Sequence, residues 1–299
     1  MPAYKGQFIR ESILSILNQD YKDFELIVVD DASPDNLESI VSEFQDERIR
    51  FYRNEKNIGG SDLVAQWNHS LEYARGEWVV LATDDDTYEP EFLSTADDVL
   101  TRYPQVNIFR ARICPCDVEG NIISVEACMP EYTTLEEFFY MMFTHKLSGG
   151  IPQFIFRKKV LYANNLFFNI PKAYGTDGYT PLLLAKDGIA SSGKILVKFR
   201  ESGINISASG KFVDEKVIAR FLVYEAIFND IVPLLSDANY FVDNSLKSFP
   251  YLAKMDILGH IYFVPLLQRH KYIHWIFEHT PYLNKRNKYS MIFRAYIKK

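Results

Sequence analysis

Short apolar runs that end in adjacent aspartates are the feature that most limits what this chain can fold into. Residues 24–29 (FELIVV) lead into aspartates at 30–31, and residues 78–82 (WVVLA) lead into aspartates at 84–86. A short continuous apolar run closed by turn residues is typical of a strand that is buried on both faces, as in a parallel sheet. Both acidic clusters are therefore predicted to follow the carboxyl ends of buried strands.

The segments around these strands alternate between the hydrophobic pattern of a helix and that of a strand. Apolar residues recur at helical spacing in some segments and at alternate positions in others, and turn residues separate them. This order predicts an α/β fold, in which a mostly parallel sheet is flanked by helices. Ligands bind beyond the carboxyl ends of strands in such sheets, which puts five carboxylates at the expected binding edge. The expected helices cover residues 7–18, 36–44, 61–73 and 90–102, and a further strand covers 48–53.

The chain changes character towards its C-terminal end. Strands and helices alternate up to about residue 210, whereas glycine becomes rare and helical periodicity dominates from residue 211 onward. We therefore expect an α/β domain at residues 1–210 and a helical C-terminal appendix at residues 211–299. In the middle of the chain, strands are expected at 106–112, 122–125, 153–156 and 194–199, and helices at 134–145 and 179–185.

Composition and charge exclude several classes of protein. The 33 basic and 39 acidic residues give a net charge of −6, which argues against a nucleic-acid-binding protein. No run of 18 or more apolar residues occurs, and the first twenty residues lack the order of a secretory signal. The three cysteines are an odd number at loose spacing, so they form neither a disulfide framework nor a zinc site. A cytoplasmic location is the resulting expectation.

Asp84, Asp85 and Asp86 carry the strongest chemical signal. Adjacent carboxylates repel one another unless a cation or a donor neutralises them, and their oxygens suit Mg²⁺ or Mn²⁺, which also bind substrate phosphates. The alternative is a solvated acidic turn before the helix that starts at Pro90, with Asp86 as its cap. The pair at 30–31 is open to the same two interpretations, a ligand contact or an Asx turn. Neither Gly-x-Gly-x-x-Gly nor Gly-Lys-Ser/Thr occurs, which argues against the usual dinucleotide and P-loop phosphate sites.

Three segments stand out when they are taken together. They are residues 19–33 (QDYKDFELIVVDDAS), 54–60 (NEKNIGG) and 82–90 (ATDDDTYEP). In this order and spacing they resemble the inverting glycosyltransferases of family 2, which have the GT-A fold. The resemblance is strong over residues 2–110 and thinner up to about residue 210.

The resemblance implies roles for individual residues. Asp31 corresponds to the carboxylate that binds the nucleotide base, usually uracil. Asp84 and Asp85 lie in the family's Asp-x-Asp region, which contacts the ribose and the metal-bound diphosphate, and Asp85 would be the metal ligand. The usual first aspartate of that motif falls at Thr83, a departure from the pattern. The base pocket would be lined by the end of the family's first strand, represented here by Pro2, Ala3 and Tyr4.

The catalytic base is harder to assign. An inverting transfer needs a carboxylate that takes the proton of the acceptor hydroxyl. The family has an acidic pair at a helix start, and the matching segment here is 174–179 (YGTDGY). If the pair falls on Asp177 and Gly178, the second and usually catalytic carboxylate is missing, whereas a shift of one residue makes Asp177 the base. Asp177 as a cap of the following helix is the alternative. The resemblance also assigns Ser148-Gly149-Gly150 to the acceptor loop.

These features predict a metal-dependent hexosyltransferase with Mg²⁺ or Mn²⁺ as its cofactor. The expected donor is a UDP-sugar, and the expected acceptor is a hydroxyl of a glycan or lipid-linked glycan, as in polysaccharide biosynthesis of the bacterial cell envelope. The alternative is a catalytically degenerate binding or partner subunit of the same fold, which Gly178 favours. A nucleotidyltransferase of similar fold is disfavoured, because the chain has no glycine-rich phosphate loop with a basic residue near its start.

The C-terminal residues 260–299 are basic and aromatic. They contain eight Lys or Arg residues and one acid, Glu278. Such a tail can make a peripheral contact with the inner face of a membrane, or its rings can pack on the main domain beneath a solvated basic face. The aromatic residues are Trp275, Phe277, Tyr282, Tyr289, Phe293 and Tyr296.

The start of the chain departs from the family pattern. A GT-A glycosyltransferase of this family opens with an apolar strand of about six residues that leads into a Pro-Ala-Tyr segment, whereas Met1 directly precedes Pro2 here. The resemblance therefore predicts that this first strand is missing and that the reading frame extends upstream of Met1.

Overall fold

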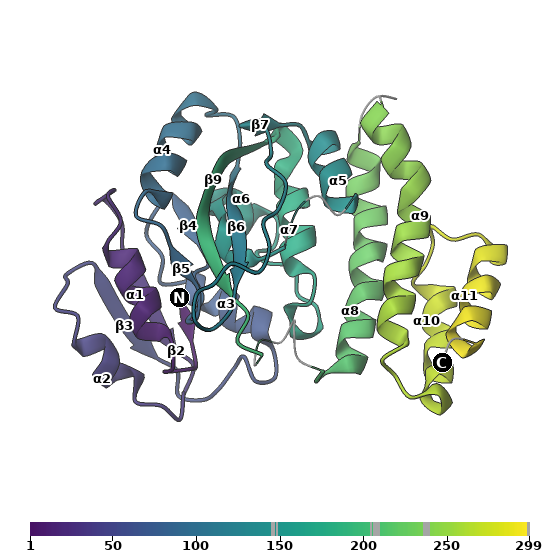
Figure 1. The fold of residues 1–299 in the computed structure, drawn as a ribbon, viewed down its shortest axis with the longest axis horizontal. Helices are drawn as coiled ribbons and strands as arrows, with labels where there is room; N and C mark the ends of the chain where they lie inside the picture. Colours follow the sequence, from purple (N-terminus) through teal and green to yellow (C-terminus); the bar gives the residue numbers. More distant parts are fainter. Residues whose placement is uncertain (145–146, 148, 204, 206–209, 236–239, 298–299) are drawn as a thin grey trace.

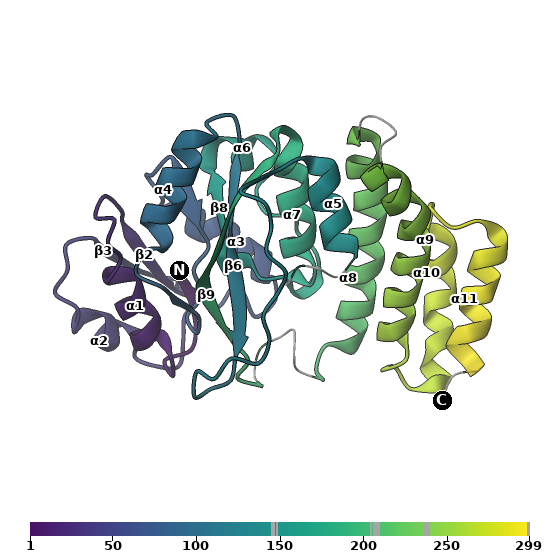
Figure 2. The ribbon, with the colours of Figure 1, turned by 45° about the horizontal axis from the view of Figure 1, so that its top comes forward.

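The computed structural model describes residues 1–144, 147, 149–203, 205, 210–235 and 240–297. Its α/β half and its helical half stand side by side, and the C-terminal helices form a row next to the sheets (Figure 1). Turning the molecule shows that helices cover both faces of the strands (Figure 2). The predicted fold class, a sheet flanked by helices with a helical C-terminal region, is confirmed.

The first sheet contains the strands expected near the start of the chain. β1 (Pro2–Ala3), β2 (Leu26–Asp30) and β3 (Ile49–Arg53) lie in that order and run parallel. All of β2 is buried, as its apolar run predicts. The connections between the strands contain α1 (Ile9–Leu17) and α2 (Leu37–Ser42).

The second sheet is mixed rather than parallel throughout. β6 and β9 pair in parallel, whereas the pairs β4–β8, β6–β8, β5–β9 and β7–β9 are antiparallel. The strand expected at 122–125 is wrong, because Ile122 makes only an isolated bridge to Cys116 and 122–125 is exposed. The strands are β4 (Trp78–Val80), β5 (Thr87–Tyr88), β6 (Ile108–Cys116), β7 (Tyr132–Thr133), β8 (Phe154–Arg157) and β9 (Ile189–Arg200).

Polar side chains cap two of the remaining described helices of the α/β half, α3 and α5. The Asp62 carboxylate accepts the N–H of Ala65 at 2.9 Å, and Thr134 forms a capping box with Glu137. These helices are α3 (Leu63–Leu71), α4 (Phe92–Arg102), α5 (Leu135–Phe143), α6 (Lys158–Ala163) and α7 (Thr176–Leu184).

The helical half shares its hydrophobic core with the α/β half. It contains α8 (Val213–Ala226), α9 (Tyr240–Ile261), α10 (Tyr272–Glu278) and α11 (Lys285–Ile297). One continuous cluster of buried side chains includes Phe139, Phe154 and Tyr179 from the α/β half together with Phe221 and Phe249 from α8 and α9. The helical half is therefore packed onto the rest of the protein through apolar contacts. No helix in the described part of the chain is long and apolar enough to cross a membrane.

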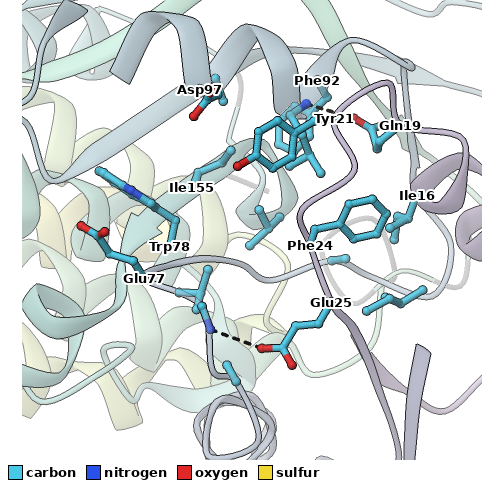
Figure 3. A pocket seen from close by; sticks show the side chains of 18 of the residues that line it. Ile16, Gln19, Tyr21, Phe24, Glu25, Glu77, Trp78, Phe92, Asp97 and Ile155 are labelled. Carbon is cyan, nitrogen blue, oxygen red and sulfur yellow. Dashed lines mark hydrogen bonds between the residues drawn. The ribbon is translucent and has the colours of Figure 1, made fainter. Parts of the chain in front are cut away.

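A cavity of about 630 Å³ separates the two sheets. It lies between β2 and β4, and the rings of Tyr21, Phe24 and Trp78 line it (Figure 3). β1 pairs with only the last two residues of β2, so the edge of β2 nearer its start has no strand partner on this side. The Met1 amino group faces the cavity and donates a hydrogen bond to the Ile27 carbonyl at 2.7 Å. The cavity thus has the strand edges and the apolar lining that a further strand would need.

An N-terminal extension of about six apolar, β-forming residues is expected to fill this cavity and raise the melting temperature. Burial lowers the pKa of the Met1 amino group from 8.0 to about 5, so the unfolded chain binds a proton between these pH values that the folded chain does not. The contribution of this amino group to stability should therefore fall by roughly 4 kcal/mol as the pH falls from 8 to 5, against the opposite effect of the raised pKa of Asp86. Calorimetry at both pH values measures both effects.

A Gly/Ser extension of the same length is the matched control. It replaces the buried amine with a peptide N–H but adds no apolar side chains, so it should remove the pH dependence without the full gain in stability. Equal melting temperatures for the two extensions would show that the cavity does not accept a strand.

Candidate donor and catalytic site

Asp84 holds the end of β1 in place. Its Oδ2 atom accepts the backbone N–H groups of Tyr4 and Lys5, both at 2.8 Å. On the opposite side, the Ala3 carbonyl accepts the N–H of Asp31 at 2.9 Å. The structure thus brings the end of β1 together with Asp31 and Asp84, which the sequence assigns to one nucleotide site.

Asp31 anchors a turn next to β2. Its carboxylate accepts hydrogen bonds from Asn54 Nδ2 (2.8 Å) and from the N–H groups of Ile58 (2.8 Å) and Gly59 (2.7 Å). A Cβ atom on Gly59 would lie 3.0 Å from Asp31 Oδ2, so glycine permits this close approach. An ionised carboxylate offers about four lone-pair sites, which leaves Asp31 acceptor capacity beyond these three bonds.

Asp85 and Asp86 lie in different surroundings although they are adjacent. Burial raises the pKa of Asp85, the charge of Asp84 raises it further, and the Lys5 ammonium group, 3.6 Å from Asp85 Oδ2, opposes the rise. Asp86 is fully buried and accepts bonds from the Thr83 hydroxyl and from the N–H of Arg200 (2.9 Å). Burial raises the pKa of Asp86 to about 7, and the charge of Asp85 adds to the rise.

The expectation that Asp86 caps the next helix is wrong. α4 begins at Phe92 with Glu91 in the N-cap position, and no side chain makes the capping bond. Asp86 instead ties its own turn to the end of β9 through Arg200. This contact joins residues 114 positions apart, which no local pattern reveals.

The acidic turn could supply a divalent cation with some of its ligands but not with all of them. Asp84 and Asp85 offer hard carboxylate oxygens, and the raised pKa of Asp85 indicates that positive charge is needed there. Within the described ranges, no group of three or more His, Cys, Asp or Glu side chains is arranged to hold a metal ion. A cation here would therefore take most of its ligands from water and from the phosphates of a bound substrate, as Mg²⁺ usually does.

Sequence analysis missed three polar residues of this turn. Lys5 pairs with Asp85, and Asn205 Nδ2 lies 3.5 Å from Asp85 Oδ2. Arg200 donates from Nε to the Asp85 carbonyl at 3.0 Å and from Nη2 to Glu11 at 2.6 Å. Arg200 is the last residue of β9 and Asn205 lies five residues further on, so the only signal in the sequence was their position at the end of that strand.

Asp177 lies inside the first turn of α7. The N-cap is Gly175, so Asp177 is not the capping residue of this helix. Thr176 is buried, and its hydroxyl donates to the Phe168 carbonyl at 2.9 Å. Asp177 Oδ2 lies only 2.9 Å from where a Cβ atom on Gly149 would stand. The candidate base therefore faces the segment that the sequence assigns to the acceptor loop, of which Ser148 lies outside the described residues.

A chain of contacts links Asp177 to the acidic turn. A Cβ atom on Gly150, next to Gly149, would lie 2.8 Å from Ile113 Cδ1 and 3.9 Å from Phe199 Cδ2. Both side chains belong to β6 and β9, and Phe199 precedes Arg200, which bonds to the acidic turn. Asp177 is thus connected to the acidic turn indirectly, through the glycines at 149–150 and the end of β9.

Comparisons with known proteins agree with this architecture. The sequence model of glycosyl transferase family 2 matches residues 1–161. A Campylobacter jejuni protein, GalNAc(5)-diNAcBac-PP-undecaprenol beta-1,3-glucosyltransferase, is 31% identical over 221 residues, which are 70% of this chain and 67% of that protein. The Escherichia coli enzyme WfgD, UDP-Glc:alpha-D-GlcNAc-diphosphoundecaprenol beta-1,3-glucosyltransferase, is 28% identical over 72% of this chain and 81% of its own.

Solved structures extend the similarity to the whole fold. TarS 1–349 from S. aureus, crystallised with UDP-GlcNAc, superposes with a TM-score of 0.74 over 99% of this chain and 87% of the TarS chain, at 18% identity. The fold and the acidic edge define a glycosyltransferase with the GT-A fold. The chain belongs to glycosyl transferase family 2.

Substitution of the two buried aspartates should separate their roles. Asp86→Ala is expected to lower the free energy of unfolding by about 1–3 kcal/mol, because it leaves the N–H of Arg200 and the Thr83 hydroxyl without an acceptor. Asp85→Ala is expected to be neutral or stabilising, because it removes one of two adjacent carboxylates that repel each other. Urea denaturation of the matched pair measures both, and equal losses would contradict this division.

Proposed function

We propose that this family 2 glycosyltransferase moves a hexose, with inversion, from UDP to a hydroxyl group of a lipid-linked glycan in cell-envelope polysaccharide biosynthesis. The observation that carries the proposal is that Asp84 binds the end of β1, whose Ala3 carbonyl accepts the N–H of Asp31, so that the segments expected to bind the nucleotide lie together. The two glucosyltransferase relatives, whose names specify undecaprenol-linked glycans, support the acceptor class, and the WfgD name supports UDP in the donor.

In the donor half, we assign the base pocket to Asp31 and to the strand end formed by Pro2, Ala3 and Tyr4. Asp84, bonded to the N–H of Tyr4, is then next to the ribose, and Asp85 is the protein ligand of Mg²⁺ or Mn²⁺. When bound, the cation would neutralise the diphosphate and so improve it as a leaving group. The Lys5 ammonium group beside Asp85 adds positive charge at the same place.

In the acceptor half, we assign the general base to Asp177. Its carboxylate takes the proton of the acceptor hydroxyl as the hydroxyl oxygen bonds to the anomeric carbon. The bond from that carbon to the diphosphate oxygen breaks on the opposite face, which inverts the configuration. Gly149 lets the acceptor loop approach this carboxylate closely, because a Cβ atom there would lie 2.9 Å from Asp177 Oδ2.

The donor assignment is tested by calorimetry of UDP binding with and without Mn²⁺, followed by transfer assays with a panel of UDP-sugars and an undecaprenyl-diphosphate-linked acceptor. Asp85→Ala is expected to lose Mn²⁺-dependent UDP binding while keeping the wild-type melting temperature. Asp23→Ala, a change of an exposed aspartate remote from the turn, is the control. Equal binding by the wild type and Asp85→Ala would overturn the metal assignment.

Asp177→Asn is expected to keep UDP binding and to lower turnover by roughly 10²–10⁴-fold, the usual contribution of a general base. In the degenerate alternative, the catalytic carboxylate was lost at residue 178. This alternative predicts an inactive wild type and a gain of transfer activity in Gly178→Asp. No side chain of the described residues lies within 4 Å of where a Cβ atom on Gly178 would stand, so the change is sterically tolerated. Activity that appears only in Gly178→Asp would favour the degenerate subunit.

We also propose a peripheral membrane contact through residues 260–299 on the cytoplasmic side. Its support is the exposure of large apolar side chains there: Phe263 is 78% exposed, Leu267 88% and Phe293 67%. Tyr289 and Tyr296 are also exposed, with Arg286 and Arg294 beside them on α11. The packing alternative holds for Trp275, which stacks on His279, and for Tyr282, which is buried. Lys298 and Lys299 lie outside the described residues.

The double variant Phe263→Ser/Leu267→Ser is expected to weaken binding to vesicles of phosphatidylcholine and phosphatidylglycerol, and wild-type binding should fall with added salt. Ile123→Ser, which removes an exposed apolar side chain from the loop after β6, is the matched control. Co-sedimentation measures all three proteins. If the wild type does not bind anionic vesicles at low salt, the membrane contact is contradicted and residues 260–299 form a packing or partner surface.

A further inference from the structure

α8 packs directly on the start of the helix that carries Asp177. Gly175, the N-cap of α7, has a φ of +117°, which is in the left-handed region that favours glycine. A Cβ atom there would lie 2.8 Å from Val223 Cγ2 and 3.3 Å from Arg220 Nη1, both on α8. Figures 1 and 2 both show α7 next to α8. The approach is therefore close enough to require glycine at this position.

Arg220 is held in one orientation by its own helix and by α9. Its Nε donates to Asp256 Oδ2 at 2.6 Å, and its Nη2 donates to the Tyr224 hydroxyl at 2.8 Å. These bonds leave Nη1 beside Gly175, two residues before Asp177. Because two of the three nitrogens are bonded, the positive charge cannot move away from α7 without breaking a partly buried ion pair.

The residue before Gly175 is fixed by the same two helices. The Tyr174 ring lies 5.9 Å from the Arg220 guanidinium carbon, and its hydroxyl donates to His260 Nε2 at 2.9 Å. His260 Nδ1 donates to the Asp256 carbonyl at 2.9 Å, which fixes the tautomer that accepts from Tyr174. The turn that leads into Asp177 is thus clamped between α8 and α9.

The charges around Asp177 come mainly from the helical half. Burial raises the pKa of the Asp177 carboxyl, and the charge of Arg220 acts against this rise, as do the N–H groups of Asp177 and Gly178. Tyr174 faces it from the preceding turn, and burial raises the pKa of that phenol, so it stays neutral near pH 7. Asp256 and His260 of α9 lie behind Arg220 and Tyr174, and Gly149 opposite carries no charge.

We propose that Arg220 is a positioning residue for the acceptor step, through which α8 and α9 orient the Asp177 carboxylate towards Gly149. The inference rests on the proposed function, in which Asp177 is the general base. It makes the helical half part of the catalytic unit, although none of its residues needs to touch the donor. Donor binding and proton removal therefore depend on different parts of the chain.

The test replaces the ion pair as a unit. The double variant Arg220→Gln/Asp256→Asn removes both charges, so neither group is left buried and unpaired. We expect UDP affinity within twofold of the wild type, turnover at pH 7 reduced at least about tenfold, and the acidic limb of the pH–rate profile moved up by roughly one pH unit. Arg220→Lys should restore part of the profile, and Lys271→Gln, in an exposed ion pair of the helical half, should leave the position of the limb unchanged. A double variant with the wild-type profile would overturn the proposal.

A second measurement does not depend on turnover. The titration of Asp177 is followed by ¹³C-carboxyl NMR, and its signal is assigned by its loss in Asp177→Asn. The midpoint should move up by roughly one pH unit in the double variant. An unchanged midpoint would overturn the role of Arg220 even if no acceptor were found. A shifted midpoint in a protein that transfers no sugar would support the electrostatic coupling and contradict the proposed function instead.

Discussion

Arg200, at the end of β9, ties the acidic edge of the sheets to the last strand of the α/β half. Three consecutive carboxylates in a partly desolvated turn raise one another's pKa, and two of the three show this rise. Arg200 gives its backbone N–H to Asp86 and its Nε to the Asp85 carbonyl, and it pairs with Glu11 of α1. The last strand of the α/β half therefore fixes the turn that follows β4. The bonds from Arg200 to Asp85 and Asp86 therefore help to hold the acidic turn in its observed conformation.

The sequence predicted local structure well because the signals for it are local. The apolar run at 24–29 became the buried strand β2, and Asp62 and Thr134 cap their helices as their positions suggest. The errors have physical causes. Residues 122–125 have strand composition but pair with β6 only through the isolated bridge from Ile122 to Cys116, and Asp86 accepts the backbone N–H of Arg200 instead of one from the start of α4.

The candidate site was predictable only in part, for a related reason. Carboxylates next to strand ends can be read from the order of residues, and Asp31, Asp84 and Asp85 were found in this way. The residues that tune them, such as Arg200 and Asn205, come from more than a hundred positions away in the chain. The contact of Arg220 with Gly175 was equally unpredictable, because the helical pattern of residues 213–226 does not indicate which side chain contacts a distant turn. The shared core around Phe139 and Phe249 explains why a division at residue 210, drawn from periodicity, separates segments that pack as one unit.

The cavity between β2 and β4 has a mechanical consequence. Where two sheets meet without a strand between them, no ladder of backbone hydrogen bonds resists their relative displacement. The cavity is partly open to the surface, so water can enter between the two sheets there. The wall of this void includes Met1, which precedes the strand end assigned to the nucleotide base. A relative displacement of the two sheets would therefore shift the strand end at which the donor is expected to bind.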